Sequence, residues 1–371
     1  MQGTAKFLEL GLTALKDNFV QLGKPYKLNF AITYRCQSRC LTCNIWKLRP
    51  SGELELEEIR KFAEKNRYFK WIGITGGEPF LRSDIYEIVE AFAKNSKGLY
   101  LLTIPTNSLT NKETILSRLE KMLGLGIPKV VITLSLDGYR ELHDKVRGVP
   151  GNFDKVMEIA RAFRELQKKY SNLSFVFGYT ISKFNLGQLE ATYQAVNKEL
   201  GSVGRDDFHI NIGQISDIYY NNADNGIEPD RKSLVEELES FISKRSGRID
   251  AMQLVEEVFQ RKLIEFAKTG KSPMRSRSLD ASLFMDSYGN VYPSIMWGRK
   301  IGNIRDSDYD LMPIWHGKEA EETRKLIAAK AEPEAWTSCE AYQSIVGNVA
   351  SFAGILYKKA PRSGFEPESQ A

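Results

Sequence analysis

Three of the four cysteines in this 371-residue chain lie within one stretch of eight residues. Cys36, Cys40 and Cys43 are spaced C-x3-C-x2-C, whereas Cys339 lies far downstream. Thiolates are the ligands that iron–sulfur clusters, zinc and copper(I) select over harder metals. Three cysteines on one loop could hold three irons of a [4Fe–4S] cluster, which leaves the fourth iron open to a small molecule. Structural zinc needs four ligands, usually from two cysteine pairs, and the chain has no second C-x2-C.

A glycine-rich turn, Thr75-Gly76-Gly77-Glu78-Pro79, follows the second predicted strand. Glycine lets the backbone approach a ligand closely, and proline fixes the direction in which the chain leaves the turn. Alone, these residues would indicate only a turn. They come one strand after the cysteines, however, so both motifs are expected at the same edge of a sheet.

Strand-like and helix-like segments alternate through the first half of the chain. Several strands are nearly continuous apolar runs, which is typical of a parallel sheet covered on both faces. The alternation predicts an α/β fold, and six units rather than eight predict a partial (β/α)6 TIM-like barrel. Active-site residues are then expected at the carboxyl ends of the strands. The predicted strands are 26–33, 70–75, 99–105, 129–136, 173–181 and 207–212, and the predicted helices are 53–66, 84–95, 111–124, 152–170 and 186–199.

The alternation stops near residue 213, which predicts a second, smaller unit. A polar, turn-rich stretch at 214–231 reads as a connection, and it is followed by two helical patterns, a short hairpin and a further helix. The predicted segments are an N-terminal helix (1–25), the barrel (26–213), connecting helices (214–274), a small C-terminal α+β extension (275–357) and a disordered tail (358–371). The connecting helices are expected at 231–244 and 251–269. The extension is expected to contain a hairpin at 282–292, a helix near 317–330 and an apolar stretch near 344–357.

The amino-acid composition and net charge indicate which broad class of protein this is. Charged residues make up 27% of the chain and hydrophobic residues 42%, with a net charge of +5. These values are typical of a soluble globular protein with a mixed-charge surface. So small an excess of basic residues predicts no nucleic-acid partner.

The chain carries no predicted signal peptide and no stretch of roughly 18 apolar residues that could span a membrane. Four cysteines that form no disulfide framework fit a reducing compartment, so a cytoplasmic location is expected. Residues 5–22 are amphipathic, and a packing helix is the main interpretation. Membrane contact, and hence a membrane-peripheral position, is the alternative. The apolar residues at helical spacing are Phe7, Leu8, Leu12, Leu15 and Phe19.

The cysteine loop and the glycine-rich turn together resemble the radical S-adenosylmethionine (SAM) superfamily. Two further motifs match: Ser135-Leu136-Asp137-Gly138 ends the fourth strand, and His143-Asp144-x-x-Arg147-Gly148, with Gly151-x-Phe153 behind it, opens the next helix. These matches resemble the subgroup whose C-terminal extension is of the SPASM or Twitch type. The resemblance covers residues 26–213 strongly and 275–345 weakly.

The resemblance implies an enzyme with one [4Fe–4S] cluster and SAM as cofactors. Reductive cleavage of SAM would give a 5′-deoxyadenosyl radical that abstracts hydrogen from a substrate C–H bond. An external one-electron reductant of the flavodoxin or ferredoxin type is implied as partner. The substrate stays open between a peptide and a small molecule or lipid. A zinc-binding interaction protein without redox activity is the alternative.

The resemblance also implies roles for individual residues. Cys36, Cys40 and Cys43 would bind the cluster, and Arg147 would pair with the carboxylate of SAM through its planar fork. Ser135 and Asp137 would hold the ribose or the carboxylate of SAM. The alternatives are turn and cap roles for Ser135 and Asp137 and a structural ion pair for Arg147. Thr42 stands where relatives often have an aromatic residue near the adenine. The predicted SAM-binding residues are Thr42, the backbone of Gly76, Gly77 and Glu78, Pro79, Asn107, Ser135, Asp137 and Arg147.

The C-terminal extension departs from the family pattern. Ser278 and Ser294 stand where such extensions place cluster-binding cysteines, and Cys339 is alone in a segment that resembles a two-cysteine one. The extension is therefore expected to keep its shape without a second cluster, and Cys339 is expected to be an ordinary buried thiol. His209 is expected to be a satisfied core or rim histidine. Tyr179, Tyr219, Tyr220 and Trp297 are expected to pack in the core, with a substrate pocket as the alternative.

Overall fold

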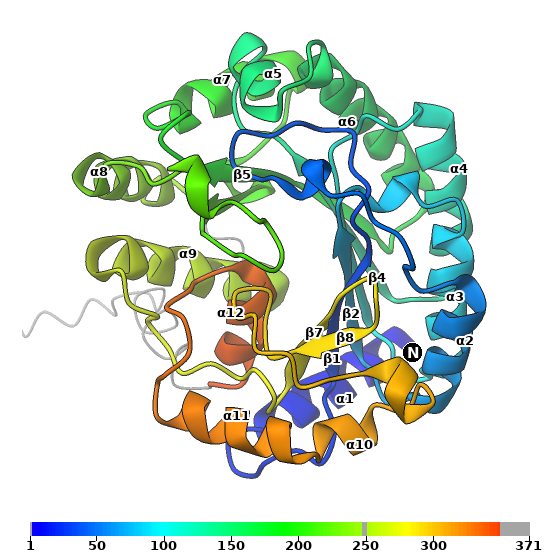
Figure 1. Ribbon diagram of the computed structural model, residues 1–371. Coiled ribbons are helices and arrows are strands. Elements are labelled where there is room, and N and C mark those ends of the chain that lie inside the picture. The colour runs from blue at the N-terminus through cyan, green and yellow to red at the C-terminus, as the bar shows by residue number, and fades with distance from the viewer. Residues whose placement is uncertain (1, 247–250, 349–371) are drawn as a thin grey trace, which may run out of the picture.

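The computed structural model describes residues 2–246 and 251–348, and a single nine-stranded sheet forms its centre (Figure 1). The strand order is β6-β5-β4-β3-β2-β1-β7-β8-β9. Strands β1 to β6 are parallel to their neighbours and curve into an open barrel, which confirms the predicted partial (β/α)6 fold. These strands are β1 (Lys27–Thr33), β2 (Trp71–Gly76), β3 (Leu101–Thr106), β4 (Lys129–Ser135), β5 (Leu173–Ile181) and β6 (Phe208–Ile212).

Helices cover the outer face of this sheet (Figure 1). Local sequence sets where they begin: α2 starts at a capping box formed by Glu55 and Glu58, and α4 starts where Asn111 Oδ1 accepts the Thr114 N–H at 3.1 Å. Alternate side chains of each strand, such as Leu28 and Phe30 of β1, are fully buried against them. The helices are α2 (Leu56–Lys65), α3 (Ile85–Asn95), α4 (Lys112–Leu123), α5 (Glu141–Arg147), α6 (Asn152–Lys169) and α7 (Leu189–Leu200).

The C-terminal part of the chain extends the same sheet. β7 (Ser282–Met285) is parallel to β1, and the predicted hairpin continues it as the antiparallel strands β8 (Asn290–Tyr292) and β9 (Gly302–Asn303). Beside the open edge of the barrel, α9 contacts both β6 and α12 (Figure 1). The helices of this part are α8 (Arg231–Ile242), α9 (Ala251–Thr269), α10 (Met312–Trp315), α11 (Lys318–Ala328) and α12 (Ser338–Val346). The predicted tail and most of the predicted apolar stretch at 344–357 lie outside the described residues.

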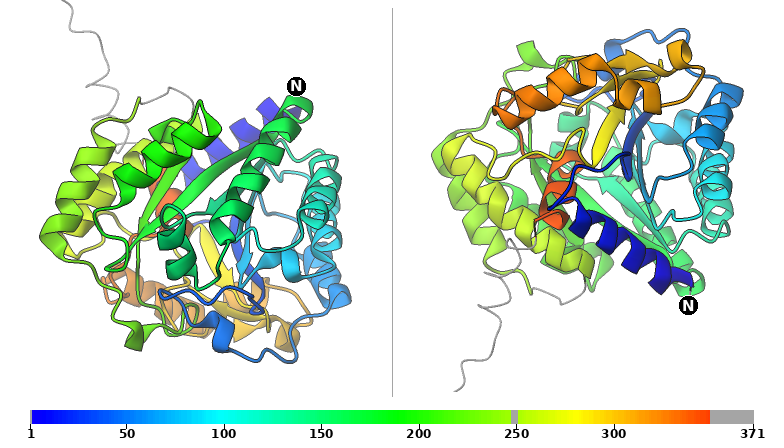
Figure 2. Two further views of the ribbon diagram at one scale, coloured as in Figure 1. Left: turned by 90° about the horizontal axis from the view of Figure 1, so that it is seen from above. Right: turned by 90° about the horizontal axis from the view of Figure 1, so that it is seen from below.

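The first helix, α1 (Gln2–Lys16), is shorter than the amphipathic pattern at 5–22. It crosses the end of the barrel at which the strands begin (Figure 2, right panel). Phe7 packs on Tyr100 just before β3, with ring centroids 5.4 Å apart, and Glu9 forms an ion pair with Lys70 just before β2.

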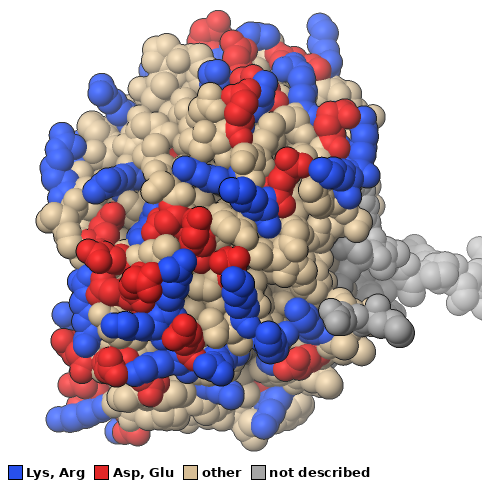
Figure 3. Space-filling view, turned by 90° about the vertical axis from the view of Figure 1, so that its right-hand side faces the viewer, with Lys and Arg blue, Asp and Glu red and all other residues tan. Residues whose placement is uncertain are grey.

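Basic and acidic side chains are interspersed over the helical face shown in Figure 3. This pattern agrees with the mixed-charge surface expected from composition. Within residues 2–246 and 251–348, no helix is both long and apolar enough to cross a bilayer.

Candidate functional site

The cysteine loop follows β1 and is fixed by hydrogen bonds to three other segments. The first is the glycine-rich turn after β2. There the Gly77 N–H donates to the Thr33 carbonyl and the Glu78 N–H to the Arg35 carbonyl, both at 2.8 Å. Because the two strands are parallel neighbours, both motifs lie at the same edge of the sheet, as predicted.

The second segment is the end of α5. The Arg39 N–H donates to the Arg147 carbonyl and the Leu41 N–H to the Val146 carbonyl, both at 2.9 Å. Gly148 ends this helix at φ +67°, and a Cβ on it would lie 2.4 Å from the Arg39 carbonyl oxygen. Only glycine allows this close approach of the helix end to the loop.

The third segment is the loop at 216–225, part of the polar stretch 214–231 that the sequence pattern predicts to be a connection. Its Tyr220 carbonyl accepts the Asn44 N–H at 2.8 Å, and its Asn222 amide donates to the Thr42 carbonyl at 2.9 Å. The Tyr219 hydroxyl accepts the Gly76 N–H at 3.2 Å and donates to the Gly76 carbonyl at 3.0 Å. This loop therefore joins the cysteine loop to the glycine-rich turn.

The three thiols of the loop line one cavity and form no disulfide. Burial raises the pKa of Cys36 and of Cys43 to about 12, and it also raises the pKa of Cys40. The Arg147 guanidinium lies 3.8 Å from the Cys40 sulfur and acts in the opposite direction. Thiolates in so buried a place need positive charge beside them, which a metal centre supplies. The donor set therefore fits an iron–sulfur cluster.

In the described part of the chain, no three His, Cys, Asp or Glu side chains are placed to hold a single metal ion. A cluster makes a different demand, because each thiolate then binds an iron of its own.

Glu78 is buried, and its side chain reaches the end of β3. Its carboxylate accepts the Phe80 N–H at 3.1 Å, the Thr106 hydroxyl at 3.0 Å and the Asn107 N–H at 2.7 Å. Burial raises the pKa of Glu78 to about 7, against the effect of these donors. The side chain thus holds the glycine-rich turn against the next strand, while the backbone of the turn faces the cavity.

Arg147 and Asp137 form an ion pair at the carboxyl end of β4, with 2.7 Å between Arg147 Nε and Asp137 Oδ2. Burial disfavours the charge on Arg147, but Asp137 and Cys40 outweigh it and raise its pKa. The other carboxylate oxygen of Asp137 accepts the Thr180 N–H at 2.9 Å. Both side chains line the cavity beside the thiols.

His143 lies behind this pair and is neutral. The Asp137 N–H donates to His143 Nδ1 at 3.0 Å, so the proton is on Nε2, which bonds Asn152 Oδ1 at 3.1 Å. The Asn152 amide in turn donates to the Asn107 carbonyl at 2.8 Å. Burial, with a smaller effect from Arg147, lowers the pKa of His143 to about 3. The histidine motif therefore positions Asp137 and Asn107.

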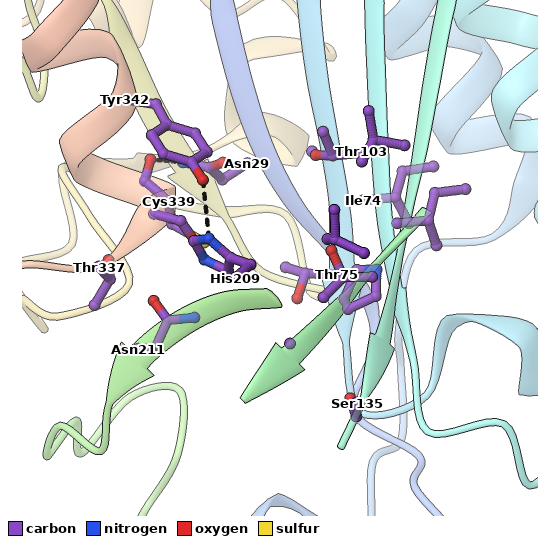
Figure 4. A pocket seen from close by; sticks show the side chains of 18 of the residues that line it. Asn29, Ile74, Thr75, Thr103, Ser135, His209, Asn211, Thr337, Cys339 and Tyr342 are labelled. Carbon is purple, nitrogen blue, oxygen red and sulfur yellow. Dashed lines mark hydrogen bonds between the residues drawn. The ribbon is translucent and has the colours of Figure 1, made fainter. Parts of the chain in front are cut away.

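The remaining predicted SAM-binding residues differ in their placement. Thr42, Asn107 and Ser135 line the cavity, and the Ser135 hydroxyl has no hydrogen-bond partner among the described residues (Figure 4). Pro79 is not on the cavity wall. It begins the short 3-10 turn Pro79–Leu81 behind the two glycines and is buried there.

The cavity has a volume of about 630 Å³ and runs through the interior of the barrel. This is within the usual range for sites that bind small molecules. Small polar side chains on the inner face of the sheet leave the space open. They include Asn29, Thr75, Thr103, Thr133 and Asn211.

His209, Glu256 and Tyr342 form a second polar group on the cavity wall. Figure 4 shows His209 and Tyr342 across the cavity from Thr75 and Ser135. His209 Nδ1 lies 3.0 Å from Glu256 Oε1 and 3.0 Å from the Tyr342 hydroxyl, which also donates to Glu256. Burial would raise the pKa of Glu256, but His209 and its neighbours outweigh burial and lower it to about 2. His209 Nε2 is buried and has no partner among the described residues. The expected satisfied histidine is thus bonded on one nitrogen only.

Cys339 also lies on this wall, on α12, and burial raises the pKa of its thiol to about 11. Its carbonyl accepts the buried Lys27 ammonium at 2.6 Å, and Lys27 also bonds Gln343 Oε1 at 2.7 Å. Burial lowers the pKa of Lys27 to about 8. The Ser278 hydroxyl, at a predicted ligand position of the extension, bonds the buried carboxylate of Glu340 at 3.1 Å.

The four aromatic candidates divide evenly. Tyr219 and Tyr220 line the cavity. Tyr179 is buried with its hydroxyl 3.3 Å from the Asn185 carbonyl, and Trp297 packs against the hydrophobic core.

Comparison with known proteins gives one matching family, the radical SAM superfamily, over residues 30–196. An AdoMet-dependent heme synthase of Methanosarcina barkeri is 26% identical over 81% of this chain and 84% of its own length. A Fe-coproporphyrin III synthase of the same organism is 28% identical, but only over 50% of this chain and 45% of that protein.

Solved structures show the same fold at low sequence identity. Native anSMEcpe with bound AdoMet has a TM-score of 0.58 at 16% identity, over 90% of this chain and 97% of that one. Streptococcus suis SuiB bound to S-adenosylmethionine has a TM-score of 0.59 at 17% identity, over 86% and 72%.

Proposed function

We infer that the chain belongs to the radical SAM superfamily and is an enzyme that uses a [4Fe–4S] cluster and SAM. We further propose that its C-terminal extension is of the SPASM/Twitch type, and which residues hold the two cofactors. Cys36, Cys40 and Cys43 hold the cluster. The observation that carries this proposal is that the three thiols, the glycine-rich turn and the Arg147 guanidinium all line one cavity.

When bound, the reduced cluster supplies the electron that cleaves SAM into methionine and a 5′-deoxyadenosyl radical, which takes a hydrogen atom from a substrate C–H bond. The residues of this chain position the reactants. The backbone at Gly76–Glu78 receives the amino group of SAM, and Arg147 receives its carboxylate. Asn107 and the free hydroxyl of Ser135 bind the ribose. Asp137 holds Arg147 in place through their 2.7 Å ion pair.

The extension is proposed to begin near residue 275 and to carry no second cluster. The two serines at its ligand positions are engaged by the protein itself. Ser278 bonds Glu340, and the Ser294 hydroxyl accepts the Met296 N–H at 3.2 Å.

Anaerobic reconstitution followed by iron analysis tests these assignments. About four irons per chain are expected, with formation of 5′-deoxyadenosine when dithionite and SAM are added. About eight irons per chain would contradict the single-cluster proposal. One zinc per chain without visible absorption would support the alternative of a zinc-binding interaction protein.

A small molecule is the proposed substrate class, because the cavity lies inside the barrel and is bounded at its far end by α1. The names of the relatives suggest a tetrapyrrole as the first candidate to consider. Of the cations on the described cavity wall, Lys27 is however already bonded within the protein, and Arg147 is assigned to the carboxylate of SAM. Several substrate carboxylates would therefore find no free partner there.

An acidic one-electron carrier, such as a flavodoxin or ferredoxin in the cytoplasm, is proposed as the reductant. Arg35, Arg39, Lys47 and Arg49 are exposed around the cysteine loop and have no acidic partner among the described residues. This basic surface lies where an electron must enter, and such surfaces speed the association of oppositely charged partners.

Charge reversal tests whether this basic surface docks the reductant without taking part in SAM cleavage itself. In the double variant Arg39→Glu/Lys47→Glu, SAM cleavage driven by reduced flavodoxin should fall about tenfold at low salt, because steering is lost. Cleavage driven by dithionite, which needs no docking, should be unchanged. An equal loss with both reductants would show damage to the loop and would contradict the docking role.

A further inference from the structure

The cavity reaches the inner side of α1 at the end of the barrel away from the cysteines. Phe7, Leu10 and Gly11 of this helix line the cavity. Gly11 is exposed, and a Cβ atom added to it would meet no atom within 4 Å, so a side chain placed there would lie in open space at the rim of the cavity. Figure 2 (right panel) shows α1 crossing this end of the barrel.

The cavity wall changes in character along its length. Near the cysteine loop it carries Thr75, Thr133 and Ser135, and the His209–Glu256–Tyr342 group adds a nitrogen without a described partner. Toward α1 the wall is formed by Trp71 and Leu101, the first residues of β2 and β3, and by the apolar side chains of α1 itself. Lys27, the first residue of β1, also lies at this end, but its ammonium is covered by the Trp71 ring and is bonded within the protein. Such a wall fits a molecule whose polar part lies near the cysteines and whose apolar part points toward α1.

The outer side of the same helix is apolar and exposed. Leu8 is 58% exposed and Leu12 66%, and Phe19, just after the helix, is 80% exposed. Lys6 and Lys16 lie on the same helix without an acidic partner among the described residues, whereas Glu9 is neutralised by Lys70. Exposed apolar residues flanked by unpaired lysines are typical of helices that lie on an anionic lipid surface.

We propose that the substrate is an amphiphile with a long apolar chain, and that the outer side of α1 binds the lipid bilayer that supplies it. This inference rests on the proposed function, because it takes the same cavity as the site of reaction. The bilayer is favoured over a soluble partner because the exposed apolar side chains of one helix, with Lys16 one turn after Leu12, lie outward while the other side of the same helix bounds the far end of the cavity. The polar part of the substrate, held by His209, is then the part that reacts.

Vesicle sedimentation tests the docking surface. The full-length protein should sediment with vesicles of phosphatidylcholine and phosphatidylglycerol, and Leu8→Glu/Leu12→Glu should weaken binding at least about tenfold. Leu81→Glu is the matched control, because Leu81 is 41% exposed elsewhere on the surface. It should bind like the wild type.

Vesicle binding by the double variant equal to that of the wild type, or no vesicle binding by the wild type, would overturn the proposal. A double variant that turns a dimer into a monomer would instead identify the face as a contact between two copies.

The cavity end is tested with a fluorescent fatty acid, 11-(dansylamino)undecanoic acid. Gly11→Trp fills the open space and should weaken binding of this probe at least about tenfold, whereas Gly11→Ala should preserve it. Unchanged binding by Gly11→Trp would overturn the proposed route.

Iron content and dithionite-driven SAM cleavage are measured on the same wild-type preparation. If both are present while vesicles and probe fail to bind, only this inference fails; if both are absent, the proposed function fails.

Discussion

Replacing Cys40 with alanine should abolish SAM cleavage and most iron binding. Cys40 is the most deeply buried thiol of the loop and lies 3.8 Å from the Arg147 guanidinium. Its loss removes one of three ligands, and two thiolates do not hold a four-iron cluster. Iron per chain and 5′-deoxyadenosine formation with dithionite are the measurements.

Cys339→Ala is the matched control for iron content. Cys339 is also a free thiol on the cavity wall, but it lies on α12, away from the cysteine loop. Its replacement should leave the iron content unchanged. Loss of iron in this variant would make Cys339 a ligand, and iron retained in Cys40→Ala would remove Cys40 from the ligand set.

Gly77→Ala should lower SAM cleavage about 100-fold, because misplacing reacting groups by about 1 Å has effects of this size. A Cβ at this position would lie 2.2 Å from the Arg35 carbonyl oxygen and 3.0 Å from the Cys36 Cβ. The first of these atoms is backbone, so the added methyl group must push the cysteine loop away from the glycine-rich turn. Iron content after reconstitution should fall as well.

Gly23→Ala controls for the substitution itself, since a Cβ there meets no atom within 4 Å. It should reconstitute and cleave SAM like the wild type. Normal cleavage by Gly77→Ala would mean that the close contact between turn and loop does not position the cofactors.

The sequence predicted the barrel well because its signals are local. Apolar runs placed the six barrel strands, β1 to β6, to within two residues at each end, and the two motifs at the ends of β1 and β2 were correctly brought to one edge. The hairpin after residue 282 was also predicted, but not its parallel pairing with β1. Pairing between strands so far apart in the chain leaves no periodic pattern to detect.

The parts of the site that escaped prediction depend on such long-range contacts. The loop carrying Tyr219 and Asn222 contains no apolar period and read as a connection, although it bonds the backbone of both motifs. His209 was expected to be a satisfied core or rim histidine, and its bonds to Glu256 and Tyr342 could not be predicted because these partners come from two later helices. The asparagines of the loop after β6 were the one available sequence signal for its role, since asparagine side chains often bond the backbone of irregular segments.

The pairing of β1 with β7 has a consequence for biosynthesis. The strand that leads into the cysteine loop has β2 on one side and β7, residues 282–285, on the other. Because a ribosome makes the chain from its N-terminus, β1 lacks one neighbour until most of the protein has been translated. The loop that receives iron therefore reaches its final support only late in synthesis. Cluster insertion is accordingly expected to follow release of the chain, when its carrier meets an already assembled barrel.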